Sequence, residues 1–196
     1  MKKTALGILL GVTAIPAMAN DGFFSGEILL GKTDQEVGNN IGGEGDDNSF
    51  GIRGAYNLNK YIGFELSYID HGETDDKFID GFGDTIKDKI SLTAFNLGAK
   101  GVLPFENGFS LHARLGLSFW DAELEETNSA VPGETFKGDD SGNDLYYGIG
   151  AQYTINSKFT IGVEYTLFEY EFKPFEDGAE PDIEVKTFAL TAGFNF

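Results

Sequence analysis

Strict alternation of apolar with small or polar residues in the final stretch, TFALTAGFNF, is the feature that most constrains how this chain folds. One face of an extended strand there carries Phe188, Leu190, Ala192, Phe194 and Phe196. The residues between them are threonine, alanine, glycine and asparagine. Water is a poor environment for so continuous an apolar stripe, so the stripe predicts a strand with a non-aqueous cover on one side.

The same period of two recurs along the chain and predicts eight strands, each near the roughly 9 to 11 residues with which a tilted strand crosses a bilayer. The predicted strands are 22–32, 49–58, 61–70, 89–103, 109–121, 144–155, 159–172 and 183–196. In the first of them we expect Phe24, Ile28 and Leu30 on the apolar side and Glu27 on the other.

The fourth predicted strand is less regular than the others. We assign Thr93, Phe95, Leu97, Ala99 and Leu103 to its apolar side, with Asn96, Gly98 and Lys100 opposite. Ile90 and Leu92 have the opposite phase, which predicts a bulge or a position at the rim of the sheet.

The connections between the predicted strands alternate in length. Short turns at 59–60, 104–108 and 156–158 follow the second, fourth and sixth strands. Long polar segments follow the odd-numbered strands and hold most of the acidic residues; they are 33–48, 70–88, 121–144 and 169–184. Short turns at one end and long polar segments at the other are typical of transmembrane barrels, and we expect the short-turn end to face the periplasm.

A closed barrel in a membrane accounts for both faces of the strands better than a soluble sandwich does. The residues opposite the apolar ones are mostly Gly, Ala, Ser, Thr and Asn, which suit the interior of a narrow eight-stranded tube. Aromatic residues also gather at both strand ends, as in membrane-interface belts. At the long-segment end these are Tyr68, Phe119, Trp120, Tyr147, Tyr165 and Tyr170.

The beginning of the chain has the pattern of a secretory signal peptide. Lys2 and Lys3 precede the apolar run TALGILLGVTAIP, and Ala17-Met18-Ala19 resembles a cleavage site. We therefore expect residues 1–19 to be a Sec signal peptide and residues 20–196 to form one domain.

Charge and composition exclude some partners. The net charge of −18, about −20 without the two lysines, argues against nucleic acid as a partner. The chain has no cysteine, so it has neither disulfides nor thiol chemistry.

Six charged residues fall on the inward side of the predicted barrel. Three are acidic and three basic, and they are Glu27, Arg53, Glu65, Lys100, Arg114 and Glu164. A narrow interior tolerates such charges when they are paired and hydrogen-bonded. We expect Arg53 to pair with Glu27 and Glu65 on adjacent strands, and Lys100 and Arg114 to reach acids across the tube. This lumen charge network either closes the barrel to ions or lines a narrow conducting path.

Catalytic and metal-binding motifs are weak. We expect His71 at a loop edge and His112 inside the barrel as a hydrogen-bonded filler, so no enzyme activity or cofactor is predicted. The acidic stretch DDSGND departs from a calcium-binding loop. The acidic segments are either a solvated, repulsive surface or a place of loose Ca²⁺ or Mg²⁺ association.

The chain resembles the small eight-stranded outer-membrane barrels, namely the OmpA transmembrane domain and OmpX-like proteins. The resemblance rests on the alternating aromatic ending and on FFSGEILLGKTD, GIRGAYNLNKYIGFELSYID and NDLYYGIGAQYTINSKFTIGVEYTLFEY. It implies an all-β, eight-stranded antiparallel up-and-down transmembrane barrel in the outer membrane of a Gram-negative cell.

The resemblance also implies a way of assembly and a class of partners. Phe188, Leu190, Phe194 and Phe196 would be the signal that the barrel assembly machinery recognises. Outer-membrane lipids and lipopolysaccharide would surround a monomer with a structural or surface-interaction role. A narrow porin-like channel of the OmpW type is the alternative, and a lipid-modifying enzyme is a further one. We expect the peptidoglycan-binding role of full-length OmpA not to carry over.

Overall fold

The computed structural model describes residues 23–37, 44–79, 81, 83–172 and 182–196. All secondary structure in this part is β-strand. The strands are β1 (Phe23–Val37), β2 (Glu44–Asn57), β3 (Ile62–Ile79), β4 (Thr85–Pro104), β5 (Phe109–Asn128), β6 (Phe136–Ile155), β7 (Phe159–Glu171) and β8 (Asp182–Asn195). Within the described residues, no helix is long and apolar enough to cross a membrane.

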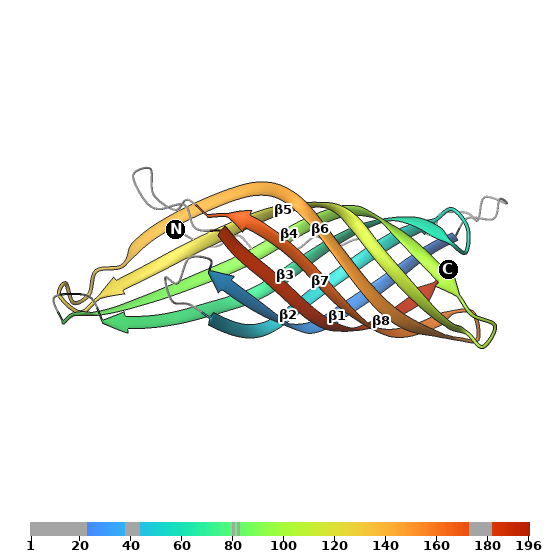
Figure 1. Ribbon diagram of the computed structural model, residues 1–196, viewed down its shortest axis with the longest axis horizontal. Coiled ribbons are helices and arrows are strands. Elements are labelled where there is room, and N and C mark those ends of the chain that lie inside the picture. Colours follow the sequence, from blue (N-terminus) through green and yellow to red (C-terminus); the bar gives the residue numbers. More distant parts are fainter. Residues whose placement is uncertain (1–22, 38–43, 80, 82, 173–181) are drawn as a thin grey trace.

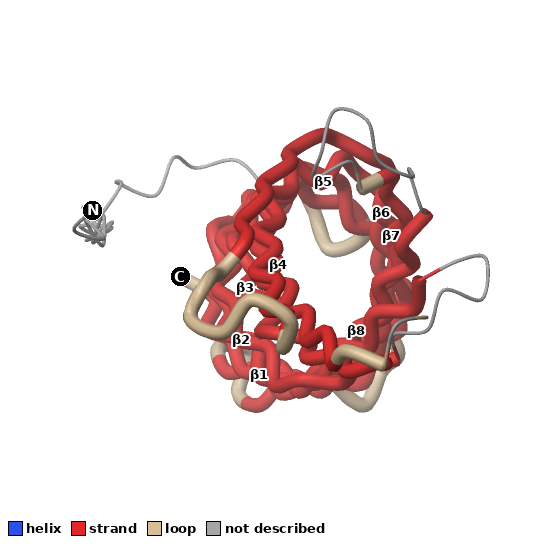
Figure 2. The backbone as a smooth tube through the Cα atoms, turned by 90° about the vertical axis from the view of Figure 1, so that its left-hand side faces the viewer, coloured by secondary structure: helices blue, strands red, loops and turns tan. Residues whose placement is uncertain are grey.

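The strands form one closed antiparallel barrel in sequence order (Figure 2). Closure is made by β1, which pairs with β2 on one side and with β8 on the other. Ile28 of β1, for example, lies opposite Ile52 of β2 and opposite Ala192 of β8. The predicted all-β, eight-stranded up-and-down barrel is therefore confirmed.

Several strands are much longer than the sequence pattern predicts. The strands β4, β5 and β6 have 20 residues each, twice the ~9–11 residues that cross a bilayer. Most of the long polar segment predicted at 121–144 consists of the ends of β5 and β6. Figure 1 shows the β3–β4 and β5–β6 hairpins projecting well beyond β1, β2, β7 and β8, at the end opposite the short turns. We call these two the projecting hairpins.

Around the lower part of the barrel, at the short-turn end, the outward face is apolar. Leu115 is 60% exposed and Ile149 is 65% exposed, as expected of side chains that lipid would cover. The residues that alternate with them point inward and are polar or small, as Arg114 and Gly148 are. We call this zone the apolar band; a barrel wall of this composition requires hydrocarbon around it.

Beyond the apolar band the polarity of the wall reverses. The outward residues of the projecting hairpins are mostly charged or polar, and an ion pair joins Lys89 of β4 to Glu73 of β3. The inward residues of β4 and β5 there are mostly apolar, and both Leu92 and Ala122 have no exposed surface. The projecting part therefore has apolar residues inside and polar residues outside, as a water-soluble β-structure has. The strands predicted from the sequence are shorter because the apolar residues change from the outward to the inward face beyond the band. A search for one continuous apolar face therefore ends at that height.

This reversal corrects the prediction that all aromatics of the long-segment end form an outward belt. Phe119 and Tyr165 do face outward, with 44% and 39% of their surface exposed. Trp120 and Tyr170 instead point into the barrel and are 5% and 1% exposed. The alternation of neighbours explains the difference, since Trp120 follows the outward Phe119 on the same strand.

The irregularity expected in the fourth strand lies in the strand beside it. In β4 the alternation is unbroken, and Leu92 points inward because it lies beyond the apolar band. The pairing of β3 with β4 shifts its register between Asp70 and Glu73. Gly72 lies in this bulge with φ of 83°, and a Cβ there would meet the carbonyl oxygen of Asn48 at 2.8 Å. Glycine suits this position for both reasons.

A charge introduced on the lipid-facing side should destabilise the barrel according to its height. We expect Leu115→Arg, in the middle of the band, to cost about 2–4 kcal/mol of unfolding free energy. The matched Glu123→Arg, outward on the same strand but beyond the band, should cost almost nothing. Denaturant unfolding in lipid vesicles measures both variants. Equal losses at the two positions would contradict the placement of the band.

Candidate functional site

The six predicted lumen charges come from six different strands and meet inside the apolar band. Register alone places Glu27 of β1 directly opposite Arg53 of β2, and Lys100 of β4 directly opposite Arg114 of β5. The other two acids, Glu65 and Glu164, lie on β3 and β7. All six side chains are largely enclosed, with at most 10% of any side chain exposed.

Arg53 joins acids on both sides of the lumen. Its Nη1 donates to Glu27 Oε2 at 2.9 Å, across the strand pair. The same guanidinium binds Glu164 in a two-point contact, with Nη2 to Oε1 at 2.7 Å and Nη1 to Oε2 at 3.0 Å. Glu65 lies farther away, with 3.9 Å between its Oε2 and Arg53 Nε. Arg53 therefore has an acid beside it and another across the tube.

Arg114 contacts the same three acids from the other side of the barrel. Its Nη1 donates to Glu164 Oε2 at 2.6 Å and its Nε donates to Glu65 Oε2 at 3.0 Å. A longer bond of 3.3 Å runs from Nη2 to Glu27 Oε2. The two arginines thus share three carboxylates, and the charges form one network rather than separate pairs.

Two neutral side chains complete the network, and the sequence pattern gave no reason to include them. Gln152 accepts a hydrogen bond from Lys100 Nζ at 2.8 Å, shorter than the 3.5 Å from Lys100 to Glu27. Tyr146 donates its hydroxyl to Glu65 at 3.1 Å. The alternation along β6 points both side chains into the barrel. Their partners on other strands depend on how far along the barrel axis each residue lies, which only the strand register determines.

Glycines make the space in which Tyr146 lies. A Cβ at Gly98 would come within 2.4 Å of the tyrosine hydroxyl, and one at Gly116 within 2.6 Å of its ring. These two glycines face each other on β4 and β5. The bare backbone of this strand pair therefore lets the ring lie along the inner wall and reach Glu65 of β3.

The prediction was wrong about the place of His71 and right about the inward direction of His112. His71 is not at a loop edge: it lies within β3, is 2% exposed, and its Nδ1 is 3.1 Å from Thr33 Oγ1 and 3.2 Å from Thr187 Oγ1. His112 does point inward, but neither ring nitrogen has a hydrogen-bond partner among the described residues. Its Nε2 is 4.0 Å from Glu164 Oε2.

Metal ligation finds no support in the part of the chain that the structure describes. No group of three or more His, Asp or Glu side chains there is placed to hold a metal ion. The lumen acids each face arginine, so a cation entering the network would have to displace a guanidinium. The arrangement instead provides a neutral set of three acids and three bases, held by short hydrogen bonds with little exposure to water.

The residues of the predicted assembly signal lie on the outer face of β8, with Phe196 directly after its last residue. Phe188, Leu190 and Phe196 are 55%, 60% and 67% exposed. Phe194 packs edge-on against Phe159 and Phe196, with ring centroids 5.1 and 5.2 Å apart. Their stripe faces the surroundings of the barrel.

A closed eight-stranded barrel with an apolar exterior and a charged interior defines the class of small transmembrane β-barrels. The chain belongs to the outer membrane protein beta-barrel domain family, whose pattern it matches over residues 5–196. Membership of this family places the protein in the outer membrane.

Known proteins agree with this assignment. Outer membrane protein A of Shigella flexneri is 28% identical over 174 residues, which cover 84% of this chain and 48% of the relative. The counterpart in Salmonella typhi is also 28% identical, over 84% of this chain and 47% of its own length. The chain thus spans about half the length of these curated relatives.

Solved structures show the same fold at low sequence identity. Neisserial surface protein A has a TM-score of 0.64 at 10% identity, covering 90% of this chain and 98% of that one. Ail of Yersinia pestis has a TM-score of 0.54 at 20% identity, covering 88% of this chain and 98% of that one.

Loss of one arginine should destabilise the barrel strongly. We expect Arg53→Met to cost about 3–5 kcal/mol, because Glu27 and Glu164 would stay enclosed with fewer cationic partners. The matched surface change is Lys89→Met, which removes a cation paired with Glu73 outside the band and should have little effect. Denaturant unfolding in vesicles compares the two variants, and a loss at Arg53 no larger than that at Lys89 would contradict the network's contribution.

Proposed function

We propose that the chain is a structural, non-catalytic outer-membrane barrel whose lumen is closed to ions by the charge network. In this proposal residues 1–19 direct export as a Sec signal peptide. The short turns and both barrel termini face the periplasm, and the long hairpins project from the cell surface. The barrel is a monomer, and the barrel assembly machinery recognises the outward apolar stripe of β8 during its insertion.

The observation that carries the proposal is the sharing of three carboxylates by Arg53 and Arg114. Ions can pass through a barrel only along a water-filled path. Charged groups that line such a path are hydrated. Here the guanidinium groups are bonded to carboxylates at 2.6–3.0 Å, and both arginine side chains are at most 2% exposed. Opening a path between them would break several charge-assisted bonds at once, each stronger than a neutral hydrogen bond.

The positions of the histidines support a non-catalytic role. A lipid-modifying enzyme would need its catalytic groups at the lipid-facing surface, where the substrate lies. His71 and His112 are instead inside the barrel, and they are 2% and 5% exposed. The barrel wall would therefore separate either imidazole from a lipid outside it.

Electrical recording tests closure of the lumen. We expect the purified barrel in a planar bilayer to show no stable unitary currents, whereas a general porin reconstituted in the same way conducts. The physical reason is that the network leaves no continuous water path through the band. Large, stable unitary currents from the native barrel would refute closure and favour a narrow channel.

The acidic outer face of the projecting hairpins supports a surface-interaction role. Glu123 of β5 and Asp139 of β6 lie directly opposite each other and point outward. Lipopolysaccharide phosphates lie at a comparable height above an outer membrane, and divalent cations bridge carboxylate and phosphate oxygens. We propose that the hairpins associate with lipopolysaccharide through Mg²⁺ or Ca²⁺.

Chelation tests this association. Proteoliposomes should retain added lipopolysaccharide in millimolar Mg²⁺ and lose it in EDTA or high salt, because screening and cation removal both weaken the bridge. Glu123→Gln with Asp139→Asn should weaken retention, while Glu106→Gln, at a short turn, should not. Retention unchanged by chelator and salt would rule the cation bridge out.

A further inference from the structure

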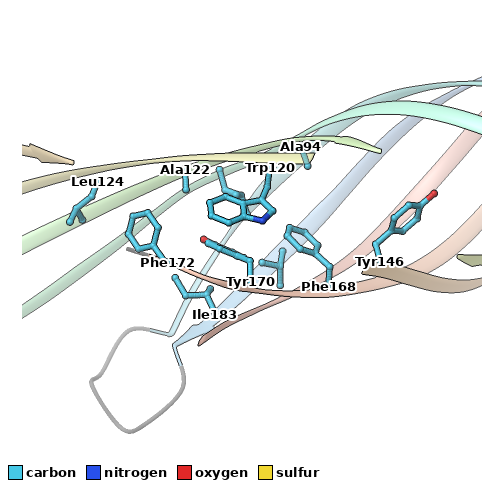
Figure 3. Close-up of a cluster of buried hydrophobic side chains, with 11 residues drawn as sticks. Ala94, Trp120, Ala122, Leu124, Tyr146, Phe168, Tyr170, Phe172 and Ile183 are labelled. Atoms are coloured by element: carbon cyan, nitrogen blue, oxygen red, sulfur yellow. The ribbon is translucent and has the colours of Figure 1, made fainter. Parts of the chain in front are cut away.

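A cluster of buried apolar side chains lies inside the barrel (Figure 3), and along β5 it follows the charge network toward the long-hairpin end. We call it the apolar plug. It comes from β4 to β8 and comprises Leu92, Ala94, Trp120, Ala122, Leu124, Tyr146, Phe168, Tyr170, Phe172, Ile183 and Val185. Each of these residues is at most 8% exposed, so the plug is a packed core rather than a cavity.

Aromatic rings form the centre of the plug. Tyr170 lies 4.5 Å from Trp120, 5.9 Å from Phe168 and 6.2 Å from Phe172, measured between ring centroids. Trp120 donates its Nε1–H to Asp144 at 2.7 Å, which satisfies its only polar group. Three rings therefore surround Tyr170 and connect β5 with β7 inside the barrel.

The centre of the plug is shielded from bulk water. Tyr170 is 1% exposed, and its hydroxyl has no hydrogen-bond partner among the described residues. Burial, with the Asp140 carboxylate nearby, raises the pKa of the Tyr170 hydroxyl above its usual value. An ion among these packed rings would lose its hydration shell.

The plug includes no residue of β1, β2 or β3, and hydrogen-bonded polar side chains lie on that side of the interior instead. Thr33 of β1 and Thr187 of β8 lie 2.7 Å apart through their hydroxyls, and both contact His71 of β3. The His71 ring is 5.5 Å from that of Phe168, so the trio abuts the plug. These three polar residues are at most 4% exposed.

A thin polar layer separates the plug from the charge network. On β5, Arg114 belongs to the network and Trp120 to the plug, and Ser118 points inward between them. Ser118 has no exposed surface, and Asn96 lies opposite it on β4. Along β5 the two filled zones are therefore successive layers of the lumen, and Tyr146 connects them, because its ring belongs to the plug and its hydroxyl donates to Glu65 of the network.

We propose that the apolar plug is a second barrier to ions, which closes the lumen independently of the charge network. A constriction lined by apolar side chains excludes water and thereby blocks ions even where its radius fluctuates. The proposal rests on the closed lumen proposed above and extends it. Opening the network alone would then leave the barrel closed.

Cysteine accessibility separates the two layers, because the native chain has no cysteine. Ser118→Cys places a single thiol between them, in a nearly isosteric exchange. Trp120→Ser with Tyr170→Ser opens the plug, and Arg53→Gln with Glu164→Gln opens the network without changing the net charge. A charged, membrane-impermeant thiol reagent is added from one side of oriented proteoliposomes at a time.

Matched controls identify effects that are unrelated to the lumen. Phe119→Ser with Tyr165→Ser removes two outward-facing aromatics from the same two strands, and it should leave the thiol introduced by Ser118→Cys protected as in the otherwise native barrel. Heat-modifiable mobility in detergent gels confirms folding of each variant. Where the Trp120 and Tyr170 pair fails to fold, Phe168→Ser takes its place.

In the otherwise native background the introduced thiol should be unlabelled from both sides. Opening the plug should give labelling from the long-hairpin side only, and opening the network should give it from the short-turn side only. Labelling of the native background from the long-hairpin side would overturn the plug as a barrier. Labelling of that background from the short-turn side alone would instead show that the charge network is open while the plug holds.

Unitary conductance provides an independent readout of the same variants. Two barriers in series predict that either opening alone stays silent and that the combined variant conducts. Stable currents from the network-opened variant alone would overturn the proposal.

Discussion

Hydrocarbon offers no hydrogen-bond partner to a peptide group, and this constraint determines the architecture. Every N–H and C=O within the band must be paired inside the protein, which a sheet achieves only by closing on itself. The continuous ladders from β1 through β8 and back to β1 meet this requirement. Once closure is imposed, a short turn after every second strand and a single register, such as Glu27 opposite Arg53, fix which side chains meet inside.

The reversal of polarity along the barrel follows from which face of the wall is shielded from water at each height. Within the band, lipid covers Leu115 and Ile149, so the interior need not be apolar and can hold charges. Above the band the outer wall meets water, and apolar residues are buried only by facing inward, as Leu92 and Ala122 do. One strand therefore serves two environments without any change in its backbone, and the interior chemistry changes at the height where the exterior chemistry does.

Sequence reasoning predicted the features that depend on a period of two and failed where heights and environments matter. Alternation identified eight strands and the inward phase of all six lumen charges. It ended β5 near Asp121, since the apolar stripe stops there, although the strand continues to Asn128. Trp120 looked like a belt residue because aromatics near strand ends usually are. The alternation of β6 also points Gln152 and Tyr146 inward, but their partners depend on the stagger between strands, which a sequence does not display.

The choice of arginine at two of the three cationic positions follows from the geometry of the network. A planar guanidinium presents donors in several directions, so Arg114 contacts carboxylates from β1, β3 and β7 at once. A lysine is a point charge, and Lys100 reaches only Glu27 among the lumen acids, with Gln152 as its closer partner. The arginines therefore connect distant walls of the tube while the lysine neutralises one edge. Because each acid contacts at least two cations, displacing any single side chain disturbs contacts on several strands, which makes the charged layer one cooperative unit.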